Sequence, residues 1–255
     1  MINYTLFINS LIGCAAAAIY AYIANRLGRR QIRFTEARLA WTFFVVWWYA
    51  LAAATLSTAV ISLLAAFGVL TLPLYLTITY VNLPAACVAL FGLTYYLLYL
   101  FTGSRKLLLP LAVFYSLFYT LVMYAINVHN PVGIRLERWQ IAVQYEIAPA
   151  GPLLGLLIVL LLFPQIIGSL AYFSLYFRVE GTTQKYRILL VSWGIIIWFI
   201  RPLLASLFGV AQQEWWQIVT VLIGLGAALI ILMAYQPPEW IKQRYNVTSI
   251  VEEPT

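Results

Sequence analysis

The chain has 255 residues, of which 64% are hydrophobic and only 9% are charged, and its mean hydropathy is +0.91. Soluble domains carry about 25% charged residues, so the composition excludes a soluble globular fold, a disordered chain and a disulfide scaffold. The net charge of +7 comes from short basic clusters between apolar runs. That pattern is typical of membrane topology rather than of nucleic-acid binding, so the composition indicates a polytopic membrane protein.

Seven apolar stretches reach the roughly 20 residues that a transmembrane helix needs. The second, third and fifth are long enough to tilt or to extend beyond the bilayer, and Pro84 and Pro164 predict kinks in the third and fifth. We therefore predict an all-α integral membrane fold, with residues 1–238 forming a seven-transmembrane helix bundle and residues 239–255 a short cytoplasmic tail. The predicted spans are Tyr4–Ile23, Ala40–Ala66, Leu72–Phe101, Leu107–Asn127, Gly151–Phe177, Ile188–Phe208 and Trp215–Tyr235.

Lysine and arginine predict the orientation, because cytoplasmic loops carry an excess of both. Twelve of the 15 basic residues fall in the first, third and fifth loops and the tail. The opposite side has only Arg135 and Arg138, and Arg201 lies within a span. We therefore expect the N-terminus outside the cell and the C-terminus in the cytoplasm of a multi-pass protein, most simply in a prokaryotic inner or plasma membrane.

The one sizeable outer loop runs from Val128 to Ala150 and alternates like a β-strand. Within it, the odd-numbered residues from Trp139 to Ile147 are apolar and share one face at the strand period of two. The run Val132–Leu136 also alternates and could pair with it, since a lone strand needs a partner. We predict a small β-hairpin between the fourth and fifth helices, with an interfacial helix as the alternative. Such a hairpin could be a packed lid or a docking surface for a partner.

Chemistry inside the membrane lacks the residues it needs. The chain has no Asp, none of its eight Glu lies deep in a predicted span, and its only His, His129, is in the outer loop. Proton relays, intramembrane haem or zinc ligation and a serine triad are therefore not expected. We predict a protein that is not an enzyme and holds no metal.

Arg201 is the most informative polar residue. An arginine in a span costs at least a few kcal/mol on insertion scales, so it must snorkel outward or find a carboxylate, backbone carbonyls, water or an anionic ligand. Asn82 lies near the same level, and Glu214 and Glu146 could fold in over it. A fixed internal ion pair or hydrogen-bond cluster is one interpretation, and a ligand or quinone head-group site or a subunit contact are the others.

A glutamine and two cysteines within the predicted spans have mainly structural interpretations. Gln165 follows Pro164, and we expect it to hydrogen-bond the carbonyls that the proline leaves free, although ligand contact is the alternative. Cys14 and Cys87 fall inside the first and third spans, where a free cysteine behaves as a small hydrophobe. We therefore predict no disulfide.

The sixth span contains the run Trp198-x-x-Arg201-Pro202, and with seven spans and an outer N-terminus it resembles the microbial rhodopsins. That resemblance implies a shared architecture and would place Trp198 near a ligand. Retinal in that family is held on a lysine of the seventh helix. Here the span Trp215–Tyr235 has no lysine, so covalent retinal is excluded and any ligand would be a lipid or another apolar molecule.

The closing run from Ala234 to Lys242, with Pro237-Pro238-Glu239-Trp240 at its centre, resembles the exit from seven-helix membrane sensor regions of bacterial histidine kinases. In those proteins the stretch leads into a cytoplasmic signalling module. Only fifteen residues follow Trp240 here, so the resemblance implies a relative that acts through another chain.

These observations predict a non-enzymatic, sensor- or receptor-like membrane protein that binds an apolar ligand or lipid and signals through a separate membrane or cytoplasmic partner. The alternatives are an accessory subunit of a larger respiratory or photosynthetic membrane complex, or a small-solute transporter. Membrane lipids are expected partners and nucleic acid is not. The predicted ligand- or partner-binding residues are Arg201, Asn82, Gln165, Trp198, Glu214 and Glu146.

Overall fold

The computed structural model describes residues 2–29, 35–136, 141–146, 151–207 and 214–248. Almost all of these residues are helical. The long helices are α1 (Tyr4–Gly28), α2 (Thr35–Ala66), α3 (Leu72–Thr102), α4 (Leu108–Val128), α5 (Gly151–Ser174), α6 (Thr182–Leu207) and α7 (Glu214–Tyr235). The shorter elements are β1 (Pro131–Leu136), β2 (Ile141–Tyr145), the 3₁₀ turns η1 (Arg105–Leu107) and η2 (Leu175–Phe177), and a last helix α8 (Glu239–Tyr245).

Several of these helices have the length and composition of membrane spans. Four stretches of the described residues qualify on their own, namely Tyr4–Gly28, Ala37–Ala66, Leu72–Thr102 and Arg105–Tyr124. A fifth qualifies if Val219–Tyr235 and Glu239–Tyr245, which are bent by 55° at a short break, are taken as one span. The chain is therefore a helical membrane protein, as its composition predicts.

Local sequence signals set where helices begin and end. The Asn3 side chain accepts hydrogen bonds from the backbone N–H groups of Thr5 and Leu6 and so caps α1. Pro73 occupies the first turn of α3, where a missing N–H costs nothing. At the other end Gly103 adopts a left-handed conformation with φ of 65°, which glycine tolerates without strain.

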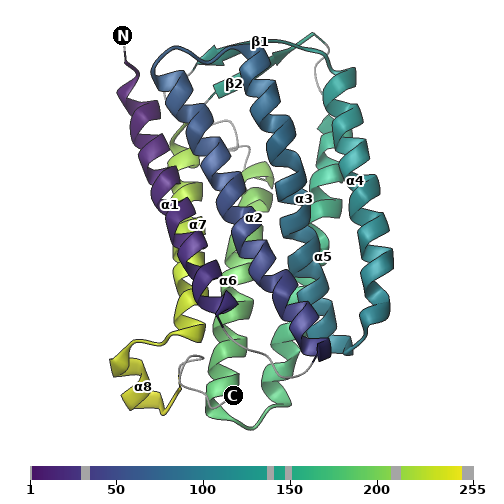
Figure 1. The fold of residues 1–255 in the computed structure, drawn as a ribbon, viewed down its shortest axis with the longest axis vertical. Coiled ribbons are helices and arrows are strands. Elements are labelled where there is room, and N and C mark those ends of the chain that lie inside the picture. The colour runs from purple at the N-terminus through teal and green to yellow at the C-terminus, as the bar shows by residue number, and fades with distance from the viewer. Residues whose placement is uncertain (1, 30–34, 137–140, 147–150, 208–213, 249–255) are drawn as a thin grey trace.

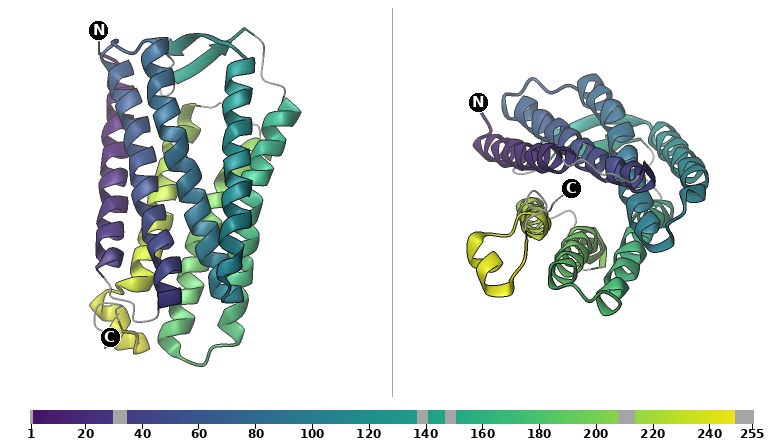
Figure 2. Two further views of the ribbon diagram at one scale, coloured as in Figure 1. Left: turned by 45° about the vertical axis from the view of Figure 1, so that its right-hand side comes forward. Right: turned by 60° about the horizontal axis from the view of Figure 1, so that its bottom comes forward.

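The long helices formed by the described residues make a ring, with α4 standing outside it (Figures 1 and 2). Neighbours in the ring follow chain order from α1 to α3, and α3 then packs on α5, α5 on α6, α6 on α7, and α7 returns to α1. α4 packs mainly against α3, and the view along the bundle in Figure 2 shows it at the periphery. This arrangement leaves the seam between α3 and α4 open on the flank of the molecule.

Aromatic rings fill the core of the ring where five helices meet. Phe44 of α2 stacks on Tyr96 of α3 with ring centroids 4.2 Å apart, and it also contacts Tyr235 of α7 at 5.9 Å. Tyr20 of α1 contacts Trp198 of α6 at 5.3 Å and Trp48 of α2 at 6.0 Å. Ring pairs at these separations contribute packing beyond their buried area, so this cluster holds α1, α2, α3, α6 and α7 together.

The predicted hairpin between α4 and α5 is confirmed as an antiparallel strand pair. β1 pairs with β2 so that Ile134 faces Val143 and Leu136 faces Ile141, with an irregularity between Pro131 and Gly133. Ile134 and Ile141 pack against a small hydrophobic cluster that includes Leu6, Ala65 and Leu70 at the ends of α1 and α2. The hairpin thus covers the end of the bundle at which the chain begins (Figure 1).

The opposite end of the bundle is basic and carries α8 (Figure 1). The Pro237-Pro238 pair follows α7, and the short α8 then buries Ile241 while 63% of Trp240 stays exposed. The Arg187 guanidinium donates to the carbonyl of Thr248 at 2.9 Å and ties the segment after α8 to α6. The basic side chains described at this end are Arg26, Arg29, Arg38, Arg105, Lys106, Arg178, Lys185, Arg187, Lys242 and Arg244.

The closest approach of α2 and α3 gives a test of this packing. A methyl group at position 92 would lie 2.7 Å from the Phe43 carbonyl oxygen, so Gly92→Ala must push the two helices apart. We expect it to lower the free energy of unfolding by about 1–3 kcal/mol, measured by thermal unfolding in detergent micelles. Gly226→Ala in α7 is the control, because its methyl would meet no described atom within 4 Å and should be neutral or slightly stabilising. Equal stability of the Gly92 variant and the wild type would contradict the packing.

Candidate functional site

Three polar side chains from three helices meet inside the bundle, and we call them the polar triad: Thr94 of α3, Tyr115 of α4 and Gln165 of α5. Gln165 Nε2 lies 2.6 Å from Thr94 Oγ1 and 2.8 Å from the Tyr115 hydroxyl oxygen. The two hydroxyl oxygens are 2.6 Å apart. All three side chains are buried, with exposed fractions of 1%, 4% and 0% in the order given above.

The protons of the polar triad can be assigned without conflict. The Thr94 hydroxyl donates to the Leu90 carbonyl at 2.8 Å, so its oxygen is left as an acceptor. The Gln165 amide has two protons and three acceptors within reach, because Nε2 also lies 3.3 Å from the Leu90 carbonyl oxygen. Its two shorter contacts are to Thr94 and Tyr115, and the Tyr115 hydroxyl can then donate to Thr94. The triad therefore ties α4 and α5 to α3 at one point, where each bond is sheltered from competing water.

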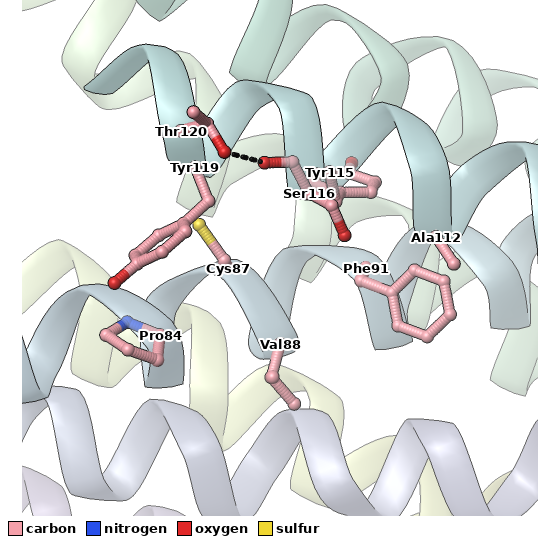
Figure 3. Close-up of a pocket in the computed structure, with 9 residues that line it drawn as sticks. All are labelled: Pro84, Cys87, Val88, Phe91, Ala112, Tyr115, Ser116, Tyr119 and Thr120. Carbon is pink, nitrogen blue, oxygen red and sulfur yellow. Dashed lines mark hydrogen bonds between the residues drawn. The ribbon is translucent and has the colours of Figure 1, made fainter. Parts of the chain in front are cut away.

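A pocket of about 360 Å³ lies between α3 and α4, directly beside Tyr115. Figure 3 shows that α3 lines one wall and α4 the other, with the Cys87 sulfur pointing from α3 toward α4. The pocket opens at the surface, because Pro84 and Val88 on one wall and Ser116 and Thr120 on the other are exposed. We call this the α3–α4 pocket; its lining residues are Pro84, Cys87, Val88, Phe91, Ala112, Tyr115, Ser116, Tyr119 and Thr120.

The pocket exists because α3 and α4 contact each other at two points along their length and carry small side chains between those points. Toward the hairpin the Tyr80 hydroxyl donates to Asn127 Oδ1 at 3.1 Å, and toward the basic end Tyr115 bonds to Thr94. Pro84 interrupts α3 between these contacts and removes one backbone hydrogen bond there. The short side chains of Cys87 on α3 and Ser116 on α4 also lie between these contacts and provide little volume, so the seam stays open.

The α3–α4 pocket lies halfway along a candidate membrane span. Cys87 is the central residue of α3, which is 31 residues long. At about 1.5 Å per residue it lies about 22 Å from either end, and a helix of this length crosses the hydrocarbon layer. The pocket therefore opens at the middle of a helix long enough to cross a membrane, and its wall offers hydroxyl groups to whatever enters.

Among the predicted residues whose side chains the structure describes, only Gln165 lies in this site, and its interactions differ from those expected. We expected its amide to bond carbonyls of α5 freed by Pro164. It reaches instead to Thr94 of α3 and Tyr115 of α4, which lie within hydrogen-bond distance of its Nε2 atom. Its carbonyl oxygen Oε1 is buried and has no hydrogen-bond partner among the described residues.

The other predicted residues lie elsewhere. Asn82 is half-buried on α3, and its Oδ1 atom has no hydrogen-bond partner in the described part of the chain. Trp198 belongs to the aromatic core through Tyr20. Glu146 follows β2, is exposed, and accepts a hydrogen bond from Asn130. The side chains of Arg201 and Glu214 lie outside the described residues, so the predicted cluster around Arg201 stays a prediction.

Sequence reasoning missed the hydroxyl groups of α4. Tyr115, Ser116, Tyr119 and Thr120 recur at a spacing of three to four residues, which places them on one face of a helix. This pattern in an otherwise apolar span could have predicted a polar face on the helix. The two cysteines are free, as predicted, and the described residues contain no group of three His, Cys, Asp or Glu side chains that could hold a metal ion.

Comparisons with protein-family models, with curated proteins and with solved structures give no match. The resemblances to microbial rhodopsins and to histidine kinase sensor regions therefore remain predictions, and a function must be argued from the site itself.

The polar triad can be tested through Gln165. Gln165→Leu keeps most of the side-chain volume but removes the amide that joins α5 to α3 and α4, so we expect a loss of about 0.5–1.7 kcal/mol of stability, the range of such bonds within membranes. Thermal unfolding in micelles measures it. Tyr119→Phe removes a hydroxyl of the α3–α4 pocket outside the triad and should change stability by less than about 0.5 kcal/mol. A Leu variant as stable as the wild type would show that the triad contributes nothing.

Proposed function

We propose that the chain is a non-enzymatic, sensor-like membrane protein with seven spans that binds an apolar molecule or lipid in the α3–α4 pocket and signals through a separate partner. The observation that carries this proposal is an open pocket at mid-membrane depth whose inner wall is Tyr115, a member of the polar triad. Ligand sites are typically concave, mostly apolar and furnished with a few polar groups, and this pocket has those features.

The lining of the α3–α4 pocket indicates the kind of ligand. Val88, Phe91 and Ala112 would contact a hydrocarbon part, and Ser116 and Tyr119 offer hydroxyl groups that both donate and accept hydrogen bonds. No lining residue is charged. The ligand is therefore a neutral amphiphile with one hydrogen-bonding group, such as an alcohol or a carbonyl, that enters from the bilayer.

The polar triad gives ligand binding a route to the rest of the bundle. A molecule in the pocket touches the Tyr115 ring, and the Tyr115 hydroxyl holds Gln165 beside Pro164 in α5. Prolines inside helices are points where the axis bends. A shift of Tyr115 would change the bend of α5, whose far end leads through η2 into α6 at the basic end of the bundle.

We propose that the partner binds at that basic end. The concentration of Arg and Lys at the α8 end supports an orientation in the cell membrane with that end in the cytoplasm and the hairpin outside. There α8 presents Trp240, and the segment after it is fixed to α6 by Arg187. A motion of α6 would therefore move the tail that a cytoplasmic partner would contact.

An accessory subunit of a larger membrane complex is the second candidate. α4 stands outside the ring and exposes Leu109, Leu117 and Tyr124 by 73%, 61% and 67%. Lipid chains or the helix of another subunit could cover that face. In this second candidate the α3–α4 pocket would receive a side chain of the neighbouring subunit.

Cys87 provides a direct test, because its thiol lines the pocket and Cys14 on α1 does not. Both are half-buried, so each serves as the control for the other. The delipidated protein is treated with N-ethylmaleimide with and without dodecanol, a neutral single-chain amphiphile, or an extract of its own membranes. We expect the additions to slow labelling of Cys87 severalfold and to leave Cys14 unchanged. Equal rates at Cys87 in all samples, or equal slowing at both cysteines, would contradict the proposal.

A further inference from the structure

Three polar groups on α5 and α6 are buried without a hydrogen-bond partner in the described part of the bundle. They are Oε1 of Gln165 and the hydroxyl oxygens of Ser169 and Ser192, and none has a hydrogen-bond partner among the described residues. All three side chains have an exposed fraction of 0%. Gln165 and Ser169 are four residues apart and so lie on the same face of α5.

The two serines differ from the other hydroxyl residues of the helices. Serine or threonine inside a helix commonly donates to the carbonyl four residues earlier, and here Thr42, Thr55, Ser57, Ser62, Thr77 and Thr120 all do so. Ser169 and Ser192 make no such bond. Their hydroxyl groups are turned away from their own helices and into the core.

Position along the helices brings Gln165 and Ser192 to a similar distance from the basic end of α5 and α6, with Ser169 about one turn nearer that end. α5 and α6 are antiparallel neighbours joined through η2. Gln165 and Ser169 lie about 13 Å and 8 Å before the last residue of α5, and Ser192 lies about 15 Å after the first residue of α6, at about 1.5 Å per residue.

We propose that this part of the core, between α5 and α6, is a binding site for water molecules. Gln165 Oε1 only accepts hydrogen bonds, while the two serine hydroxyls can donate or accept, so the occupant must be able to donate. It must also be neutral, because residues 163–174 of α5 and 188–200 of α6 contain no charged side chain. Buried water typically makes about three bonds to such groups, and here it would join α5 to α6 behind the polar triad.

The direction in which serine-to-alanine substitutions shift the thermal unfolding midpoint tests this site. The test does not depend on the α3–α4 pocket. If Ser169 and Ser192 bind water, replacing either with alanine removes hydrogen bonds, and we expect the midpoint of thermal unfolding in micelles to fall by about 2–4 °C for each. The double variant should fall by less than the sum, because both serines share one water cluster. If the hydroxyls have no partner at all, alanine removes an unmet polar group and the midpoint rises, which would overturn the proposal.

Two controls distinguish bound water from ordinary loss of a buried serine and from a bound cation. Ser62→Ala on α2 is the matched control, because Ser62 is buried but donates to the Thr58 carbonyl at 3.1 Å, so its removal should shift the midpoint less.

Replacing sodium chloride with choline chloride should leave all the midpoints unchanged. A stabilisation specific to sodium, lost in both serine variants, would assign the site to a cation and overturn the assignment to water. A map with ordered solvent should show density bonded to Ser169 and Ser192, and apolar side chains packed against both oxygens would also overturn it.

Discussion

The amide of Gln165 is the contact on which the middle of this bundle depends. A polar amide at mid-membrane depth has no bulk water to bond, so its N–H groups must find partners inside the bundle. Gln165 does this by reaching two other helices at once, with Thr94 Oγ1 at 2.6 Å and the Tyr115 hydroxyl at 2.8 Å. Because α4 lies outside the ring and packs mainly on α3, this bond is also what connects α4 to α5.

The few attachments of α4 explain why a pocket survives beside Tyr115. α4 is held at Tyr115 and again where Tyr80 meets Asn127, and between these points small residues and Pro84 leave the seam open. Packing elsewhere is dense, with Phe44 stacked on Tyr96 and Gly92 pressed against the Phe43 carbonyl. A closed core on one side and a loosely attached helix on the other is an arrangement in which a ligand can enter from the bilayer without disturbing the ring.

The sequence predicted the elements well and the site poorly, for a physical reason. Hydropathy and the period of two are local, so the long helices lie over the seven apolar runs and β1 and β2 pair where alternation predicts them. α8 was missed because seven residues are too few for a hydropathy signal. The polar triad was missed because Gln165 is 71 residues from Thr94 and 50 from Tyr115, and which of many hydroxyls it meets depends on how the helices pack. Arg201 was singled out because an arginine in a membrane span has a high insertion free energy. That is a local property of the sequence, and it does not say where a ligand binds.

The central claim is that the α3–α4 pocket holds a neutral amphiphile from the membrane, and native mass spectrometry of gently extracted protein tests it most directly. The wild type should carry one small apolar molecule per chain. Ala112→Phe, which fills the pocket, should lose that molecule, and Val113→Phe, on the exposed face of the same helix, should keep it. Recovery of the wild type with no bound molecule, or equal retention by both variants, would contradict the account, and recovery with other subunits in a fixed ratio would favour the accessory-subunit function instead.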